Sequence, residues 1–182
     1  MMYIFLSLAA GLVLLPYINP QCCQVECIGE FLVSGPNGVL DSALTASSEF
    51  DSLHGPDRAR LGTQEELPGI GSGSWSPAVL NTDQWIQVDF GSVKRVSGVV
   101  TQGRNAGPQN QSTTEYRVLY RENIEPFRAV TKNGNEMFQG NDDLVTPVIN
   151  MFKSVMARFV RINPTAWEDY IALRFDVIGC EI

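Results

Sequence analysis

The chain has 182 residues, 44% of them hydrophobic, which suits one globular domain of ordinary size. Its net charge of -7 argues against nucleic-acid binding, which needs basic stripes to neutralise phosphates, and weakens purely electrostatic attachment to anionic lipid. The single histidine leaves little material for acid–base or nucleophilic catalysis, and the Gly-x-Ser-x-Gly and His-Glu-x-x-His motifs are absent. We therefore expect a protein that is not an enzyme.

Residues 1–21 have the composition of a secretory signal peptide. Residues 1–18 carry no charge, and the run Ile4–Leu15 is apolar except for Ser7, about the length of a signal-peptide core. An uncleaved membrane anchor is the alternative, but Pro16 interrupts the run before the roughly 20 apolar residues that a spanning helix needs. We expect a secreted, extracellular protein whose mature part, residues 22–182, is a single domain with a short cysteine-rich lead.

The four cysteines of the chain lie at the two ends of this mature part, at Cys22, Cys23, Cys27 and Cys180. Because disulfides form in oxidising compartments, we expect at least one bond to tie the two ends together. In the chain-entropy model such a long loop stabilises the fold by about 4 kcal/mol. A zinc site is the competing explanation, but it would need the distant Cys180 and His54 and lacks paired Cys-x-x-Cys spacing, so no metal site is expected.

Apolar and polar residues alternate with a period of two in several segments, whereas the mature chain shows no sustained helical periodicity. The alternating segments are 85–90, 115–121, 158–162 and 171–178, and the residues expected on their apolar faces include Ile86, Val88, Phe90, Tyr116, Val118, Tyr120, Val160, Ile162, Ile171, Leu173, Phe175 and Val177. Turn-rich segments with Gly, Pro and Asn separate them. The pattern predicts an all-β domain, an antiparallel sandwich or barrel.

Two polar features of these segments need an explanation. Arg174 stands in the last alternating segment, where we expect it to make a buried ion pair, with Asp89 as the candidate partner. The apolar strand that begins at residue 97 is followed, after Arg104, by a polar segment with no large hydrophobic residue until Tyr116. Such a segment does not contribute to a core.

An ordered series of motifs extends over nearly the whole mature chain. It comprises Asp41–Ser48, Ala59–Leu61, Trp75 with Pro77, Trp85–Gly91, Gly98–Arg104, Tyr116, Gly140–Asn141 with Asp143, Asn150, Ala157–Ile162, Trp167, Ile171–Arg174 and Gly179–Cys180. In this order the motifs resemble those of the discoidin, or coagulation factor 5/8 type C, domain family. The resemblance runs from about Cys27 to Cys180.

The resemblance implies an eight-stranded, jelly-roll-like β-sandwich whose ends are joined by a disulfide between Cys27 and Cys180. It also implies a ligand site at one end of the barrel, formed by a first loop at 48–58, a second loop between residues 76 and 84, and a third loop at 105–114. Ligands of the family include phosphatidylserine membranes, sugars, collagen and peptide tails. The polar segment after Arg104 is then the third loop, whose sequence suits a partner.

The loops favour a polar ligand over a membrane. Family members that insert into membranes place bulky apolar groups on the first and third loops, but here the first has only Phe50 and Leu53 and the third has none. A buried leucine contributes roughly 1.5 to 3 kcal/mol, so membrane attachment of this acidic chain would be marginal. Asn110 also begins a glycosylation sequon, which would place a hydrated glycan on the third loop.

A few directed polar groups beside an apolar platform are typical of a sugar or protein site. The candidate ligand-binding residues are Phe50, Leu53, His54, Arg58, Arg60, Arg104 and Asn105. Purely structural roles are the alternative for Arg60 and Arg104, and plain solvent exposure is the alternative for His54. Trp75, Trp85 and Trp167 are expected to pack in the barrel.

We therefore predict a secreted adhesion or lectin-like module that recognises cell-surface glycans or extracellular matrix and receptor proteins. The alternative is a protein that binds phosphatidylserine at membrane surfaces. No cofactor is predicted, and a calcium requirement is left open. Cys22 and Cys23 remain once the ends are tied, and because adjacent cysteines bond to each other only through a strained ring, we expect them to link chains into a dimer or larger assembly.

Overall fold

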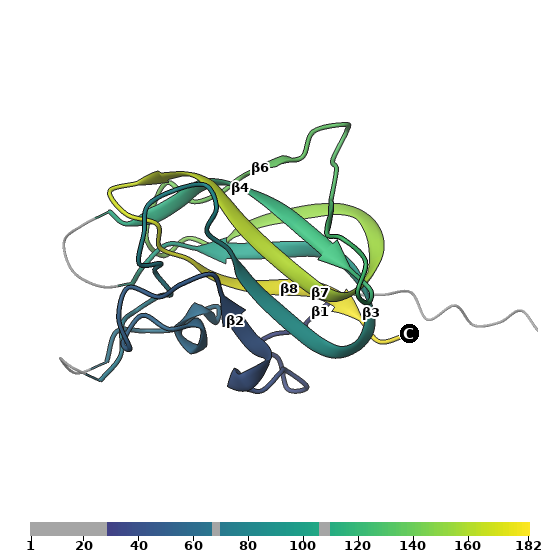
Figure 1. Ribbon diagram of the computed structural model, residues 1–182, viewed down its shortest axis with the longest axis horizontal. Coiled ribbons are helices and arrows are strands. Elements are labelled where there is room, and N and C mark those ends of the chain that lie inside the picture. The colour runs from purple at the N-terminus through teal and green to yellow at the C-terminus, as the bar shows by residue number, and fades with distance from the viewer. Residues whose placement is uncertain (1–28, 67–69, 106–109) are drawn as a thin grey trace, which may run out of the picture.

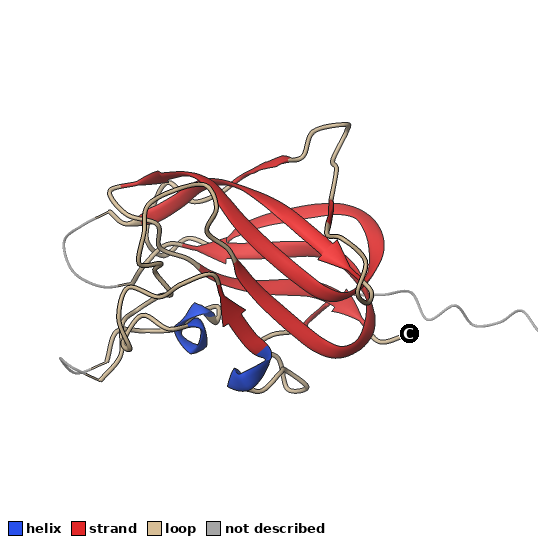
Figure 2. Ribbon diagram, viewed as in Figure 1, coloured by secondary structure: helices blue, strands red, loops and turns tan. Residues whose placement is uncertain are grey.

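Strands dominate the computed structural model, which describes residues 29–66, 70–105 and 110–182. Two short 3-10 helices, η1 (Asp41–Ala43) and η2 (Pro56–Ala59), are the helical elements in these ranges (Figure 2). None of the helices in the described ranges is long and apolar enough to cross a membrane. The expected signal peptide and Cys22, Cys23 and Cys27 lie outside the described residues.

Eight strands are hydrogen-bonded into one antiparallel sheet, as expected (Figure 1). They are β1 (Glu30–Phe31), β2 (Leu44–Ala46), β3 (Ile86–Gln102), β4 (Ser112–Arg121), β5 (Arg128–Ala129), β6 (Met137–Gln139), β7 (Val148–Glu168) and β8 (Arg174–Cys180). The strand order is β1-β8-β3-β7-β4-β5, with β2 also paired to β3 and β6 to β4. The fold is the all-β jelly roll that the resemblance implies.

The long strands β3 and β7 bend, and this turns the single sheet into two layers (Figure 1). Their pairing shifts register between Asp89 and Lys94, where Gly91 adopts a positive φ of 73° that glycine tolerates without strain. Before this bulge β3 also pairs with β2, and after it with β8. Each long strand therefore contributes to both layers, and the core lies between them.

The alternation in the sequence correctly predicts which side chains enter the core. Ile86, Val88, Tyr116, Val118 and Val160 are all fully buried. Burial raises the pKa of the Tyr116 hydroxyl to about 12. The strands extend further than the alternating segments because the bulges interrupt the period of two inside β3 and β7.

Strand β8 is buried on both faces, and the predicted partner of Arg174 is wrong. The Arg174 guanidinium is 1% exposed and donates to the carbonyl oxygens of Gly103, Thr63 and Leu144 at 2.7, 2.8 and 2.6 Å. Burial lowers its pKa to about 10. Asp89 lies at the other end of β3, where it accepts from Nε and Nη2 of Arg158 at 2.7 and 2.9 Å.

Cys180, the last residue of β8, is disulfide-bonded. Since the other three cysteines lie outside the described residues, the pairing with Cys27 stays a prediction. Trp75 is fully buried, and Trp167 packs partly buried against the core, as expected. Trp85 instead lies half-buried at the surface, where the Arg161 guanidinium stands 3.8 Å from its ring centre.

Candidate ligand-binding site at the loop end

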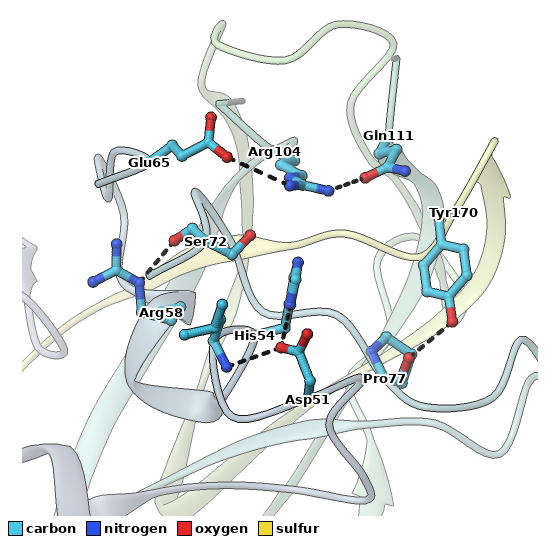
Figure 3. Close-up of polar contacts among 10 residues, drawn as sticks. Asp51, His54, Arg58, Glu65, Ser72, Pro77, Arg104, Gln111 and Tyr170 are labelled. Carbon is cyan, nitrogen blue, oxygen red and sulfur yellow. Dashed lines mark hydrogen bonds and ion pairs between the residues drawn. The ribbon is translucent and has the colours of Figure 1, made fainter. Parts of the chain in front are cut away.

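The connections expected to form the ligand site meet at one end of the sandwich, away from the C-terminus in Figure 1. The β3–β4 connection and the β7–β8 turn reach this end together because Ser112 pairs with Glu168. The first loop joins them through the segment 72–76. Side chains distant in sequence are thereby brought to one place (Figure 3).

Backbone hydrogen bonds hold the first loop in a defined shape. Phe50 N–H donates to Ser76 O at 2.8 Å, and Ser72 N–H donates to Leu53 O at 2.8 Å. Beneath the loop, the indole N–H of the buried Trp75 donates to Ser48 O at 3.0 Å. A ligand that binds here does not have to order the first loop, which lowers the entropy that binding loses.

Three aromatic rings form the apolar part of the site. The Phe50 side chain is 57% exposed, and its ring meets those of His54 and Tyr170 edge to face, with centroid distances of 5.3 and 5.8 Å. The Tyr170 hydroxyl donates to Pro77 O at 3.2 Å, which fixes the ring against the second loop (Figure 3). The Phe50 ring is therefore an exposed apolar surface that His54 and Tyr170 hold in place from its sides.

His54 is oriented by the first loop itself. Its Nδ1 lies 2.6 Å from Asp51 Oδ1 (Figure 3). The same Asp51 oxygen accepts from Leu53 N–H at 2.9 Å. These hydrogen bonds, that from His54 foremost, lower the pKa of the Asp51 carboxyl. An ionised carboxylate only accepts hydrogen bonds, so Nδ1 of His54 carries the hydrogen. In the neutral ring Nε2 is then an acceptor.

Arg104 closes the β3–β4 connection. Its backbone N–H donates to Gln111 O at 3.0 Å, and its Nη1 donates to Gln111 Oε1 at 2.7 Å. Its Nη2 lies 3.8 Å from Glu65 Oε1, a long ion pair (Figure 3). Its Nε is buried and has no hydrogen-bond partner among the described residues, so the guanidinium retains a free donor.

A pocket of about 100 Å³ lies between these groups. The residues that line it are Phe50, His54, Ser76, Arg104, Gln111 and Tyr170. Ser76 is 3% exposed, and its hydroxyl has no hydrogen-bond partner in the described part of the chain. Buried hydroxyls are almost always bonded, so the Ser76 hydroxyl, like those of Ser72 and Ser74 before it in the chain, is an unused donor and acceptor among the described residues.

Of the seven candidate residues, Phe50, His54 and Arg104 line the pocket, and the other four lie outside its lining. Arg58 donates to Ser72 O at 2.7 Å and to Gln64 O at 2.7 Å and pairs with Glu66 at 2.6 Å. It clamps the segment that follows η2, and its guanidinium has little capacity left for a ligand.

Arg60 also stabilises the fold away from the pocket. It pairs with Asp41 at 2.6 Å and donates to Val33 O and Val39 O at 2.6 and 2.7 Å, which ties down the N-terminal segment. The Asn105 amide donates to Gln64 Oε1. Leu53, half-buried, contributes its backbone to the loop.

Sequence reasoning missed Ser76, Gln111 and Tyr170. Gln111 and Tyr170 stand just before β4 and just after β7, two strands that pair with each other. An antiparallel pairing of these two segments, had it been assigned from sequence, would have placed both residues at the loop end. No sequence signal marks Ser76.

The comparison with known proteins decides the family. The model of the F5/8 type C domain matches residues 43–177. The chain belongs to the F5/8 type C domain family. It is 35% identical over 164 residues both to coagulation factor VIII from Homo sapiens and to hemocytin from Bombyx mori, matches that cover 87% and 88% of this chain but 7% and 5% of those proteins.

Among solved structures, discoidin II from Dictyostelium discoideum matches with a TM-score of 0.68 and 27% identity, over 76% of this chain and 55% of that chain. F5/8 type C domains are non-catalytic binding modules for proteins, phospholipids or carbohydrates, although some structural neighbours are parts of glycoside hydrolases. The relatives are mostly secreted or extracellular proteins.

Proposed function

We propose that this F5/8 type C domain is a secreted, non-enzymatic recognition module that binds a glycan at a cell surface or in the extracellular matrix. The glycan is either free or carried on a protein, and it docks at the pocket beside Phe50. One observation carries the proposal: the buried Ser76 hydroxyl and the Arg104 Nε, both without partners among the described residues, accompany an exposed aromatic platform.

This combination suits a sugar, which presents an apolar C–H face and a ring of hydroxyl groups. Phe50 and Tyr170 offer rings to the apolar face, while Ser76, His54 and Arg104 offer an acceptor and donors to the hydroxyls. The pocket of about 100 Å³ equals roughly three water molecules. It therefore admits one substituent of a sugar ring while the ring itself lies across Phe50.

A glycan array with the secreted protein tests this proposal, followed by calorimetry with the best glycan and two variants. We expect Phe50→Ala to weaken binding by about ten- to a hundredfold, since it removes a ring worth roughly 1.5 to 3 kcal/mol of apolar contact. Leu40→Ala is the control because Leu40 is 78% exposed but lies outside the pocket. An array without any bound glycan, or equal affinities of Phe50→Ala and Leu40→Ala, would refute the proposal.

Attachment to phospholipid is the second candidate, and one observation favours it. Ile70 beyond η2 and Val79 and Leu80 of the second loop are 59%, 53% and 39% exposed, in addition to Phe50. We rank it lower because the net charge of -7 opposes approach to anionic headgroups. In co-sedimentation with phosphatidylserine liposomes, a Val79→Ser/Leu80→Ser double variant should lose lipid binding and keep glycan binding.

Two further proposals concern the N-terminal cysteines and the third loop. We propose that Cys22 and Cys23 link chains, which would raise the avidity of a weak module, and a monomer on a non-reducing gel would contradict this. We also propose a glycan on Asn110, whose side chain is exposed. Mass spectrometry before and after glycosidase treatment tests the second of these.

A further inference from the structure

A second cluster of unusual side chains lies on the outer face of the layer that contains β4 and β7. Val118 and Val160 point into the core, so the neighbouring positions 121, 159 and 161 point outward. Arginines and aromatic rings alternate there and form the arginine–aromatic ladder, which consists of Trp85, Arg161, Phe127, Arg121, Phe159 and Arg158.

The distances along the ladder are those of successive cation–π contacts. The Arg161 guanidinium carbon lies 3.8 Å from the Trp85 centroid and 4.0 Å from that of Phe127. The Arg121 guanidinium carbon lies 4.5 Å from the same Phe127 centroid and 4.6 Å from that of Phe159. Stacking on rings orders the guanidinium groups while it leaves their N–H edges free for a ligand.

Among the described residues, only the Arg158 end of the ladder makes an ion pair. Arg158 pairs with Asp89 through two hydrogen bonds. Arg161 donates from Nε to the uncharged Gln87 side chain at 2.7 Å. Arg121 has no ion pair or side-chain hydrogen bond with any described residue and its Nε is buried without a partner, although its charge contributes to the lowered pKa of Asp89.

The two unneutralised arginines repel each other. Burial and then the charge of Arg121 lower the pKa of Arg161. An anion between them would relieve this repulsion and use donors that are now unbonded. Arg117, two residues before Leu119 on the same outer face of β4, is exposed and also lacks an ion pair with the described residues, which adds a third cation.

The surface around the ladder is long and hollowed. A shallow hollow of about 550 Å³ lies on one side, and its lining includes Trp85 and Arg117 as well as the carboxylates Asp83 and Glu115. Another of about 550 Å³ lies on the other side, lined among others by Gln87 and Phe159. An extended chain that crosses the ladder can therefore contact the surface on both sides.

We propose that the arginine–aromatic ladder, together with Arg117, binds the sulfate groups of a linear sulfated polysaccharide. The site shares no residue with the loop-end pocket, so it stands apart from the function proposed above. An anionic membrane fits this surface less well: a broad bilayer would also cover the carboxylates Glu122 and Glu125 beside the exposed Ile124, whereas a narrow polysaccharide chain can follow the ladder without covering them.

The test is calorimetric titration of the full secreted protein with a heparin-type sulfated hexasaccharide and with its desulfated counterpart. We expect binding of the sulfated sugar alone, weakened by added salt because the contacts are charged. Arg121→Gln and Arg161→Gln should each reduce affinity about tenfold, the effect of losing one charge-assisted hydrogen-bonded contact. Lys153→Gln removes the same charge from an exposed position outside the ladder and should leave affinity unchanged.

Three results would overturn the proposal. These are equal binding of the desulfated sugar, equal affinities of the ladder variants and Lys153→Gln, or retention on phosphatidylserine vesicles without binding of the sulfated sugar. If a variant fails to fold, the wild-type protein still decides the question by NMR. The Arg121 and Arg161 Nε–H signals should shift on addition of the sulfated hexasaccharide and remain in place with the desulfated one.

Discussion

The loop end has a base, formed around Arg174, and a rim, formed around Arg104 and Ser76. Buried polar groups are fully hydrogen-bonded at the base and lack partners among the described residues at the rim. At the base, Arg174 of β8 is buried and donates to three backbone carbonyls, one of which belongs to Gly103. At the rim, the next residue, Arg104, keeps its Nε unbonded among the described residues, and Ser76 keeps its hydroxyl unbonded. The satisfied groups hold the loops in position, and the two unsatisfied groups are those that the proposed glycan would use.

The difference teaches how to separate structural from functional polar groups in this fold. Removal of a buried group that makes all its hydrogen bonds destabilises the protein. A buried group without partners destabilises the protein while it is present. Variants of the base should therefore unfold more easily and variants of the rim should not.

Replacement of Arg174 by Met should have the largest effect. It leaves the carbonyl oxygens of Thr63, Gly103 and Leu144 without their buried donor, so we expect the free energy of unfolding to fall by about 4 kcal/mol. Urea unfolding followed by tryptophan fluorescence measures this. Arg117→Met, at an exposed position, should stay within about 0.5 kcal/mol, and a similar loss in both variants would contradict the role of the base.

Removal of the predicted terminal disulfide should have the next largest effect. We expect Cys27→Ser to lower the free energy of unfolding by about 3 kcal/mol because the unfolded chain is no longer cross-linked. Peptide mapping of the unreduced wild-type protein checks the pairing directly. A fragment that joins Cys180 to Cys22 or Cys23 would show that the predicted partner is wrong.

Two buried or half-buried carboxylates of the scaffold should respond to pH with opposite signs. Burial raises the pKa of Asp176, although Val33, Ser34 and Val177 donate backbone N–H groups to it. In the unfolded chain the pKa of Asp176 has its ordinary value of about 4. The stability that this carboxyl contributes is complete below that pH and is lost as the pH rises through its raised pKa in the folded protein. The free energy of unfolding of wild type, measured relative to that of Asp176→Asn, should therefore fall as the pH rises from 4.

Asp89 should show the reverse dependence. The hydrogen bonds from Arg158 are the main cause that lowers the pKa of Asp89. Its contribution, about 1 kcal/mol for a half-exposed pair, is present above the ordinary value and lost as the pH falls through the lowered one. Thermal unfolding of Asp89→Asn and wild type should converge below about pH 4. Parallel curves over the whole range would count against the pair.

The smallest change in stability should come from Ser76→Ala at the rim. Removal of an unpartnered buried hydroxyl should leave the free energy of unfolding unchanged or raise it by up to about 1 kcal/mol, while glycan binding weakens. Ser47, at an exposed position, is the control for a bonded hydroxyl, since it donates to Gln84 at 2.7 Å and accepts from Trp85 N–H at 3.0 Å. Ser47→Ala should lose about 1 kcal/mol. Equal losses at both serines would remove the distinction between base and rim.

The sequence allowed prediction of the layers because apolar alternation reports directly on burial, as at Ile86 and Val88. It did not allow prediction of the Arg174 contacts, since its acceptors are backbone carbonyls in three separate connections that carry no side-chain signature. Arg58 and Arg60 were assigned to the loop end from their position in the chain. Whether the N–H groups of such an arginine are all hydrogen-bonded within the protein depends on which segments fold beside it.

Site residues could be predicted from the sequence only where they lie close together within one loop. Phe50 and His54 lie four residues apart in one loop, and Arg104 begins the polar segment that follows β3. Tyr170 reaches the same pocket from a turn more than a hundred residues after His54. Its place depends on strand pairing across the sheet, which one sequence does not display.

The attachment of three connections to one guanidinium also bears on how this scaffold tolerates change. Arg174 fixes one carbonyl in each connection, at residues 63, 103 and 144, so the chain beyond each fixed point can be lengthened or exchanged without shifting the strands below. The same frame can thus present unrelated contact surfaces, and loops grafted between these anchor points would inherit a prepared geometry.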